Sequence, residues 1–178
     1  QVAELNARIK LSRQAMASVP GQFMPPELAK VILEIETALL ERLCRIGKSA
    51  DAAQRLEQTR ATIAEGKLPS NPVAELDSEA KGKEARLQLE NLFKQLQLAE
   101  QDRLIDNATF KQAGGQVRRF LISATLDTFN ATAKLGMQQG KPRVAKLQYE
   151  RAIAFITRLN NPGLAKHLEQ YKRLLQRA

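Results

Sequence analysis

The sequence predicts an all-α protein, either an antiparallel helical bundle or a short helical-repeat superhelix, with about six or seven helices. Apolar residues recur at alternating spacings of three and four along most of the chain, which is the period of a buried helical stripe. No stretch shows the alternation of apolar and polar residues that is typical of a strand. Gly and Pro number only 9 and 7 among 178 residues, too few for the many turns of a β-sandwich or barrel.

The first predicted helix covers residues 2–19 and carries a narrow apolar stripe. Its members fall at coiled-coil-like spacings: Val2, Leu5, Ile9, Ser12, Met16 and Val19. Pro20 ends the helix, because proline cannot continue the hydrogen-bond ladder. No capping residue precedes the stripe, so we expect a helix that began upstream, after a signal peptide, a membrane anchor or an unstructured leader that has been removed. The same stripe could pair with a copy of itself.

The second predicted helix follows a proline-rich turn. Phe23 and Met24 lie in this turn, where their large apolar side chains either fold back onto the bundle or form a small exposed contact site. Pro26 opens the helix, since proline is preferred in the first turn, and Gly47 is the predicted C-cap. A wide apolar stripe predicts that this helix is central: Leu28, Val31, Ile32, Ile35, Leu39, Leu43 and Ile46.

A shorter helix is predicted from about residue 51 to residue 64, with Ser49 or Asp51 as its N-cap and Gly66 at its end. Residues 66–72 contain two prolines among turn-forming residues, which indicates a linker.

The polar segment that follows holds Gly82, so we expect it to be frayed up to residue 83. The predicted organisation is an N-terminal part over 1–66, a linker over 67–83 and a C-terminal part over 84–178, or one continuous domain.

The C-terminal part has further helical stripes that are separated by turn formers. Gly114-Gly115 is expected to break the chain or to act as a hinge between two of them. Asn160-Asn161-Pro162-Gly163 closes another helix. The predicted helices cover about 84–105, 117–137, 142–159 and 164–175.

Residues with catalytic or metal-binding chemistry are scarce. The chain has one Cys and one His, which excludes disulfide frameworks and Cys/His zinc clusters. Any serine or cysteine hydrolase triad would have to use His167, which we expect on a solvated surface. Residues 47–49 match the end of a phosphate-binding loop, but Arg42 stands where that motif needs its first glycine, and no strand precedes it. We therefore expect that the chain is not an enzyme and that it binds no cofactor. Cys44 is expected to be buried as a small apolar side chain.

The segment 129–152 resembles a tetratricopeptide repeat, a unit of two antiparallel helices. Its matching aromatic and small residues are Phe129, Ala133, Ala145, Tyr149 and Ala152. The segment departs from the family at Thr132, where the family has Leu, and at Gly136, where it has Tyr. A fainter trace covers residues 39–63, which align with the first segment at an offset of 93 residues. The resemblance implies a helical-repeat superhelix, and a generic bundle is the alternative.

The positive charge is concentrated in the C-terminal part. Residues 1–110 hold 15 Lys/Arg and 16 Asp/Glu, whereas residues 111–178 hold 13 Lys/Arg and three Asp/Glu. Such asymmetry bears on partners rather than on fold. The candidate residues for binding a partner or a polyanion are Arg118, Arg119, Lys141, Arg143, Lys146, Arg151, Lys172 and Arg173.

Two functions follow from these observations. The first is a non-enzymatic interaction or scaffold module, which docks another protein, acidic in character, in a groove between helices. The second is an accessory protein that binds nucleic acid without sequence specificity through its basic C-terminal half. We expect a cytoplasmic protein, attached to a membrane only if a missing N-terminal segment tethers it.

Overall fold

The computed structural model describes residues 1–47 and 50–178. These ranges contain seven α-helices, two 3₁₀ turns and no strand: α1 (Val2–Ser18), η1 (Gly21–Phe23), α2 (Pro26–Ile46), α3 (Ala50–Glu65), α4 (Glu79–Gln101), α5 (Asn107–Gln138), α6 (Pro142–Leu159), η2 (Pro162–Leu164) and α7 (Ala165–Arg177). The all-α prediction is confirmed. The predicted N-cap Ser49, like part of the predicted turn at 47–49, lies outside the described residues, and Asp51 lies within the first turn of α3.

The helices pack into two compact units that share two long helices. Unit 1 comprises residues 1–74 and 87–121, and unit 2 comprises residues 75–86 and 122–178. The boundary falls inside α4 and inside α5, so each of these helices contributes to both units. The predicted linker over 67–83 is thus divided between the units: its proline-rich first part is bonded to the end of α1 and belongs to unit 1, and the rest belongs to unit 2.

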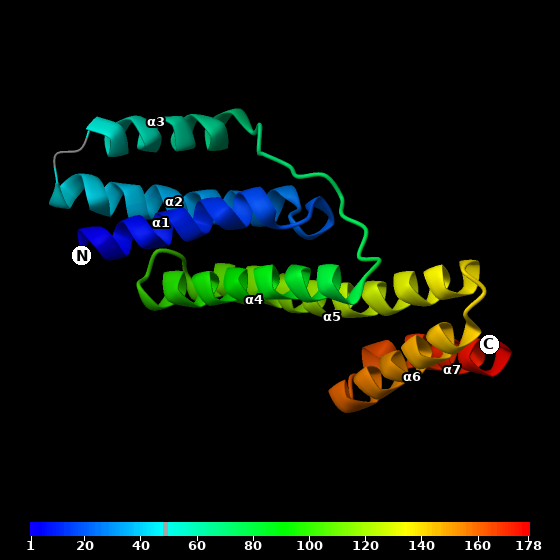
Figure 1. The fold of residues 1–178 in the computed structure, drawn as a ribbon. Helices are drawn as coiled ribbons and strands as arrows, with labels where there is room; N and C mark the ends of the chain where they lie inside the picture. The colour runs from blue at the N-terminus through cyan, green and yellow to red at the C-terminus, as the bar shows by residue number, and fades with distance from the viewer. Residues whose placement is uncertain (48–49) are drawn as a thin grey trace. The chain divides into compact units, whose positions relative to one another are not determined.

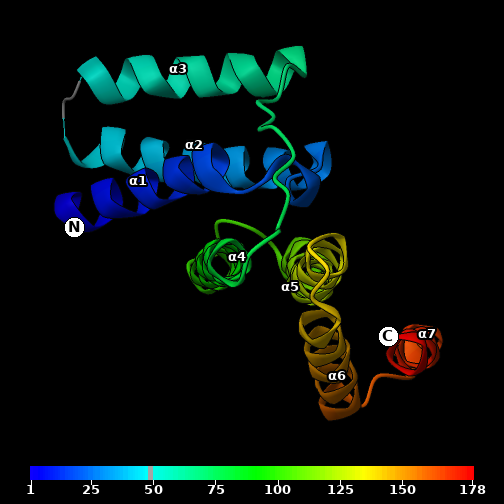
Figure 2. The same ribbon diagram turned by 45° about the vertical axis from the view of Figure 1, so that its right-hand side comes forward.

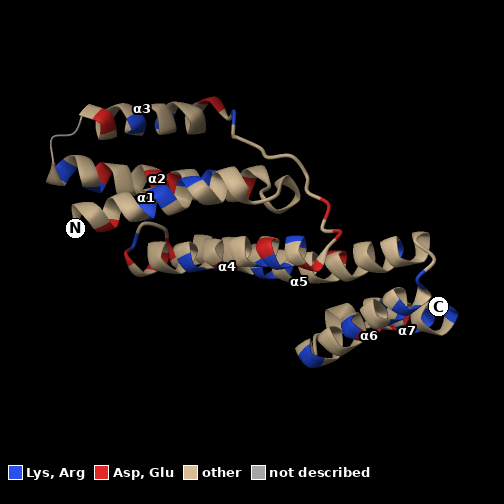
Figure 3. Cartoon of the chain, in the orientation of Figure 1, with Lys and Arg blue, Asp and Glu red and all other residues tan. Residues whose placement is uncertain are grey.

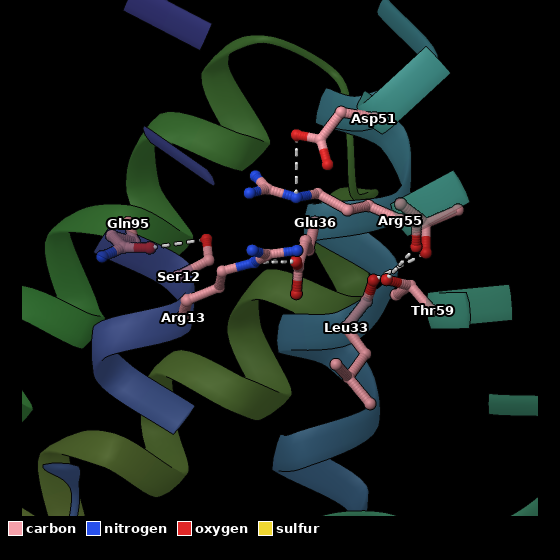
Figure 4. A network of polar contacts seen from close by, with 9 residues as sticks. Ser12, Arg13, Leu33, Glu36, Asp51, Arg55, Thr59 and Gln95 are labelled. Carbon is pink, nitrogen blue, oxygen red and sulfur yellow. Dashed lines mark hydrogen bonds and ion pairs between the residues drawn. The ribbon is translucent and has the colours of Figure 1, made fainter. Parts of the chain in front are cut away.

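In unit 1, α1, α2 and α3 lie side by side as antiparallel neighbours (Figures 1 and 2). Ser12 Oγ of α1 donates a hydrogen bond to Gln95 Oε1 of α4 over 2.9 Å, and Arg13 Nε donates to Glu36 Oε1 of α2 over 2.8 Å (Figure 4). Val2 is exposed, but the rest of the predicted α1 stripe is buried within the unit: Leu5, Ile9, Ser12, Met16 and Val19. Packing within unit 1 thus already covers the stripe that could pair with a second copy.

The turn between α1 and α2 holds two buried apolar side chains. Phe23 is only 2% exposed and Met24 only 4%. The Phe23 ring packs against Phe120 of α5 with 5.5 Å between ring centroids. The alternative of an exposed contact site at Phe23 and Met24 is therefore wrong, because both side chains are buried and the Phe23 ring packs against α5.

Residues 67–74 form an extended strap that runs along the α1–α2 turn. Asn71 Nδ2 donates to the carbonyl oxygens of Met16 and Val19 over 2.6 and 2.8 Å, which satisfies the free carbonyls at the end of α1. Gln22 exchanges two hydrogen bonds with the backbone of Ala74. Gly21 permits the contact, since an added Cβ would lie 2.0 Å from the Asn71 carbonyl oxygen.

Helix α4 begins at Glu79, so the expectation of a frayed segment up to residue 83 is wrong for its last five positions. Gly82, which suggested fraying, lies inside the helix and packs directly against Thr128 of α5 in unit 2. A Cβ at Gly82 would lie 2.3 Å from Thr128 Oγ1 and 2.9 Å from Thr128 Cβ. The glycine thus serves close helix packing, which outweighs its low helix propensity.

Helix α5 is continuous from Asn107 to Gln138, so the predicted break or hinge at Gly114-Gly115 is wrong. Gly114 is buried in unit 1, where an added Cβ would lie 3.1 Å from the Phe93 ring. Phe93 in turn packs against Phe110, with 5.9 Å between ring centroids. Here too the glycine makes room for a neighbouring side chain.

Unit 2 is built around α6, which forms an antiparallel hairpin with α7 and packs against the C-terminal part of α5 (Figure 1). Its buried cluster consists of Leu126, Ala152, Ile156 and Tyr171. The small residues predicted at helix contacts, Ala133 and Ala145, are also fully buried. Leu135 and Leu159 are exposed, because they lie on the outer faces of α5 and α6.

Candidate functional site

The structure divides the eight predicted basic residues between the two units. Arg118 and Arg119 belong to unit 1, and the others belong to α6, to its N-cap or to α7 in unit 2. All eight are exposed. Three of them have contacts: the Arg118 guanidinium carbon lies 4.8 Å from the centroid of the Phe93 ring, Lys172 Nζ lies 3.8 Å from Glu169, and Arg151 Nη1 lies 3.4 Å from Glu79. Two of them line hollows together with other charged residues: Arg173 lies in an open hollow along α7 with Lys166, Glu169 and Arg177, and Arg151 lies in a groove between helices.

This groove has a volume of about 480 Å³ and lies in unit 2, where the first turns of α4 meet the C-terminal part of α5 and the middle of α6. It is lined by Glu79, Arg86, Thr125, Thr128, Phe129, Thr132, Gln148, Arg151, Ala154, Phe155 and Arg158. Its volume falls in the range of clefts that bind a small ligand or the side chains of a peptide.

Helical periodicity places these residues on common faces. On α6, Gln148, Arg151, Phe155 and Arg158 follow one another at spacings of three and four, so they project to one side. On α5, the three threonines of the groove recur with the same period. Glu79 and Arg86 are seven residues apart on α4 and therefore also share a face.

The floor of the groove is apolar and rich in hydrogen-bond acceptors. Phe129 and Phe155 pack edge to face, with 6.4 Å between their ring centroids. Thr128 Oγ1 donates to the Ala124 carbonyl over 2.7 Å, and Thr132 Oγ1 donates to the Thr128 carbonyl over 2.7 Å. These hydroxyl protons are therefore used within α5, and the two oxygens keep only acceptor lone pairs for anything above them.

The rim of the groove is cationic. Arg86, Arg151 and Arg158 line it together with one acidic residue, Glu79. The Arg151–Glu79 contact is the ion pair of the groove, whereas neither Arg86 nor Arg158 has an ion-pair partner among the described residues. Arg86 is half-buried, whereas Arg151 and Arg158 are exposed.

The sequence predictions missed most of this groove. Arg86 was missed because it lies in the acidic-to-neutral half of the chain, far from the basic cluster in sequence. The one usable signal was on α6, where Arg151, Phe155 and Arg158 recur at four and three residues and mark a mixed apolar and basic face.

Two ionisable groups of unit 2 that do not line the groove have raised pKa values. Burial raises the pKa of the Asp127 carboxyl, although a good part of its side chain is exposed. Burial also raises the pKa of Tyr171, and a hydrogen bond with Asn130 opposes the shift. Tyr171 packs against Tyr149, with 6.4 Å between the ring centroids, so the two aromatic rings contact each other.

Residues with other chemistry are dispersed. Within residues 1–47 and 50–178, no three side chains of His, Cys, Asp or Glu come together as a metal site would require. Cys44 is half-buried, not fully buried as expected, and His167 is exposed. None of the helices in the described ranges is both long enough and apolar enough to cross a membrane.

Comparisons with known proteins give no relationship to any family. The resemblance to tetratricopeptide repeats stays a prediction, and the functional argument depends on the residues of the groove. The chain matches no protein-family model, and no curated protein or solved structure is significantly similar to it.

Proposed function

We propose that this chain is a non-enzymatic interaction module that docks an acidic and partly apolar segment of a partner protein in the groove of unit 2. The observation that carries the proposal is Arg86, a half-buried and unpaired arginine at the rim of an aromatic floor. Such a guanidinium gains most from a partner carboxylate, which it can bind through two parallel hydrogen bonds.

The chemistry of the floor favours a protein segment over a phosphate. Phe129 and Phe155 offer apolar contact area, which matches the aromatic and Arg-rich centres of protein interfaces. The oxygens of Thr128 and Thr132 offer only lone pairs, which suit the N–H groups of a peptide and repel the oxygens of a phosphate.

A selection from a library of random linear peptides, displayed on phage and screened against the full chain, tests the proposal. We expect the bound peptides to be enriched in Asp or Glu together with Leu or Phe. Arg86→Ala and Arg158→Ala should weaken the selected peptides about tenfold or more each, as the loss of a charged hydrogen-bond partner implies.

The matched controls are Arg143→Ala and Lys146→Ala, each of which removes one positive charge of α6 that lies outside the groove. Each control should leave peptide affinity within about twofold, because solvent screens exposed charges. Absence of any enriched peptide, or equal loss in either control, would overturn the proposal.

The second candidate function is non-specific nucleic-acid binding, and the charge distribution favours it. Helices α6 and α7 carry eight Lys/Arg and two Asp/Glu, as Figure 3 shows by the predominance of blue over red. The two tyrosines of unit 2 pack against each other, so electrostatic contacts with phosphates would have to supply the affinity.

Fluorescence anisotropy with a mixed-sequence duplex and a single strand, at ~50 and ~200 mM salt, tests this function. A nucleic-acid affinity that falls about a thousandfold between the two salt concentrations would support it. A variant with Lys141, Arg143, Lys146 and Arg151 changed to Glu should then show no binding. No binding at the lower concentration would exclude it.

A further inference from the structure

We infer that Glu79 is a built-in competitor of the partner: its carboxylate contacts Arg151 in the free protein, and a carboxylate of the docked segment displaces it. This inference rests on the proposed function of the groove and adds a regulatory contact to it. Glu79 and Arg151 both line the groove, and Glu79 Oε1 lies 3.4 Å from Arg151 Nη1.

The contact is held by charge rather than by packing. The Glu79 side chain is 84% exposed, and no other hydrogen bond of this carboxylate is present among the described residues. Since Glu79 is the first residue of α4, its side chain is free to rotate into solvent without disturbing the helix ladder. A partner can therefore displace the carboxylate while the rest of the groove stays in place.

The same contact shows which group the groove accepts. Of its three arginines, Arg151 contacts a carboxylate of this chain, and Arg86 and Arg158 have no ion-pair partner among the described residues. An intramolecular carboxylate is always present at high effective concentration, so it competes with any acidic ligand. It also repels such a ligand, because like charges at short distance disfavour association.

The consequence is confined to Arg151. A partner carboxylate placed at Arg151 exchanges one exposed ion pair for another and gains little there. Carboxylates placed at Arg86 or Arg158 meet arginines that Glu79 does not contact. Glu79 thus favours acidic segments that place their carboxylates at these two arginines.

Affinities of the selected peptides for Glu79→Gln and Glu84→Gln variants test the inference. Gln keeps the size of Glu and removes its charge, and Glu84 is an exposed acid of the same helix that does not line the groove. We expect Glu79→Gln to bind acidic peptides about two- to fivefold more tightly, the range of an exposed ion pair, with Glu84→Gln within experimental error of the wild type. Equal or weaker binding by Glu79→Gln, or the same gain in Glu84→Gln, would refute the inference.

A second selection, carried out on Glu79→Gln, separates this inference from the proposed function. Peptides that bind both proteins with equal affinity support the docking function and refute the inference that Glu79 competes with the partner. Peptides that bind both proteins, but Glu79→Gln more tightly, support both proposals. No peptide with either protein overturns both.

Discussion

The contact between Gly82 and Thr128 makes a sharp prediction for the substitution Gly82→Ala. An added Cβ would lie 2.3 Å from Thr128 Oγ1, 2.6 Å from Cγ2 and 2.9 Å from Cβ. Because the Thr128 Cβ is among these atoms, no rotamer of that side chain relieves the overlap, and α5 must move away from α4 locally. Overpacking of this kind costs about 1–3 kcal/mol, of which the better helix propensity of Ala returns about 1 kcal/mol.

We therefore expect a net loss of about 1–2 kcal/mol in the free energy of unfolding, or a Tm lower by about 2–6 °C in thermal denaturation followed by circular dichroism. The matched control is Gly115→Ala in α5, where the added Cβ meets only the end of the Arg119 side chain at 3.7 Å. That variant should gain about 0.5–1 kcal/mol from helix propensity alone.

Replacing glycine with alanine is thus expected to lower the free energy of unfolding at Gly82 and to raise it at Gly115. A scale of helix propensity alone predicts an increase at both positions. A Gly82→Ala variant that is as stable as Gly115→Ala would refute the packing argument. Adding Thr128→Ala to Gly82→Ala should recover part of the loss, because the two side chains are in direct contact and their effects are not additive.

Three further predictions concern the strap, a buried acid and a shifted carboxyl. Gly21→Ala should destabilise the protein by about 1–3 kcal/mol in denaturant unfolding, since its Cβ would overlap a backbone carbonyl at 2.0 Å, whereas Gly47→Ala, with nothing within 4 Å, should stay near the wild type. Arg13→Ala should cost about 1–3 kcal/mol because it leaves the buried Glu36 carboxylate without its partner, and adding Glu36→Gln should restore part of the loss; no restoration would contradict this assignment. Because burial raises the Asp127 pKa, the folded protein binds this proton more tightly than the unfolded chain does, and stability falls as the pH rises through the two pKa values. Asp127→Asn should therefore have a higher Tm than the wild type at about pH 7, with the difference lost near pH 3, and an equal Tm at both values would contradict it.

Much of the fold could be predicted because helix boundaries here are set by local chemistry. Pro20 and Pro26 bracket the first turn as expected, and Gly66, with a positive φ of 68°, ends α3. Gly82 and Gly114 were assigned wrongly because their role lies in contacts with residues far away in sequence, at Thr128 and Phe93, which no local pattern encodes.

The candidate site was predictable only in part for a related reason. The basic cluster in the C-terminal part was visible in the composition, but a count of charges does not indicate which arginines face a groove. Arg86 joins Arg151 only because α4 and α6 approach the same stretch of α5 in unit 2. That approach depends on tertiary packing, whereas the local patterns predict single helices and not which helices pair.

The strap bears on how the protein would respond to a cut in its backbone. Lys67 is exposed and precedes the hydrogen-bonded residues of the strap, so a trypsin-like protease has a target there that lies in no helix. Cleavage would leave one fragment with α1–α3 and another with α4–α7, still joined in unit 1 by the Ser12–Gln95 hydrogen bond, the Arg8–Asp102 ion pair and the Phe23–Phe120 contact. The two fragments should therefore co-elute as one complex, and separately expressed halves of the chain become candidates for reassembly by complementation.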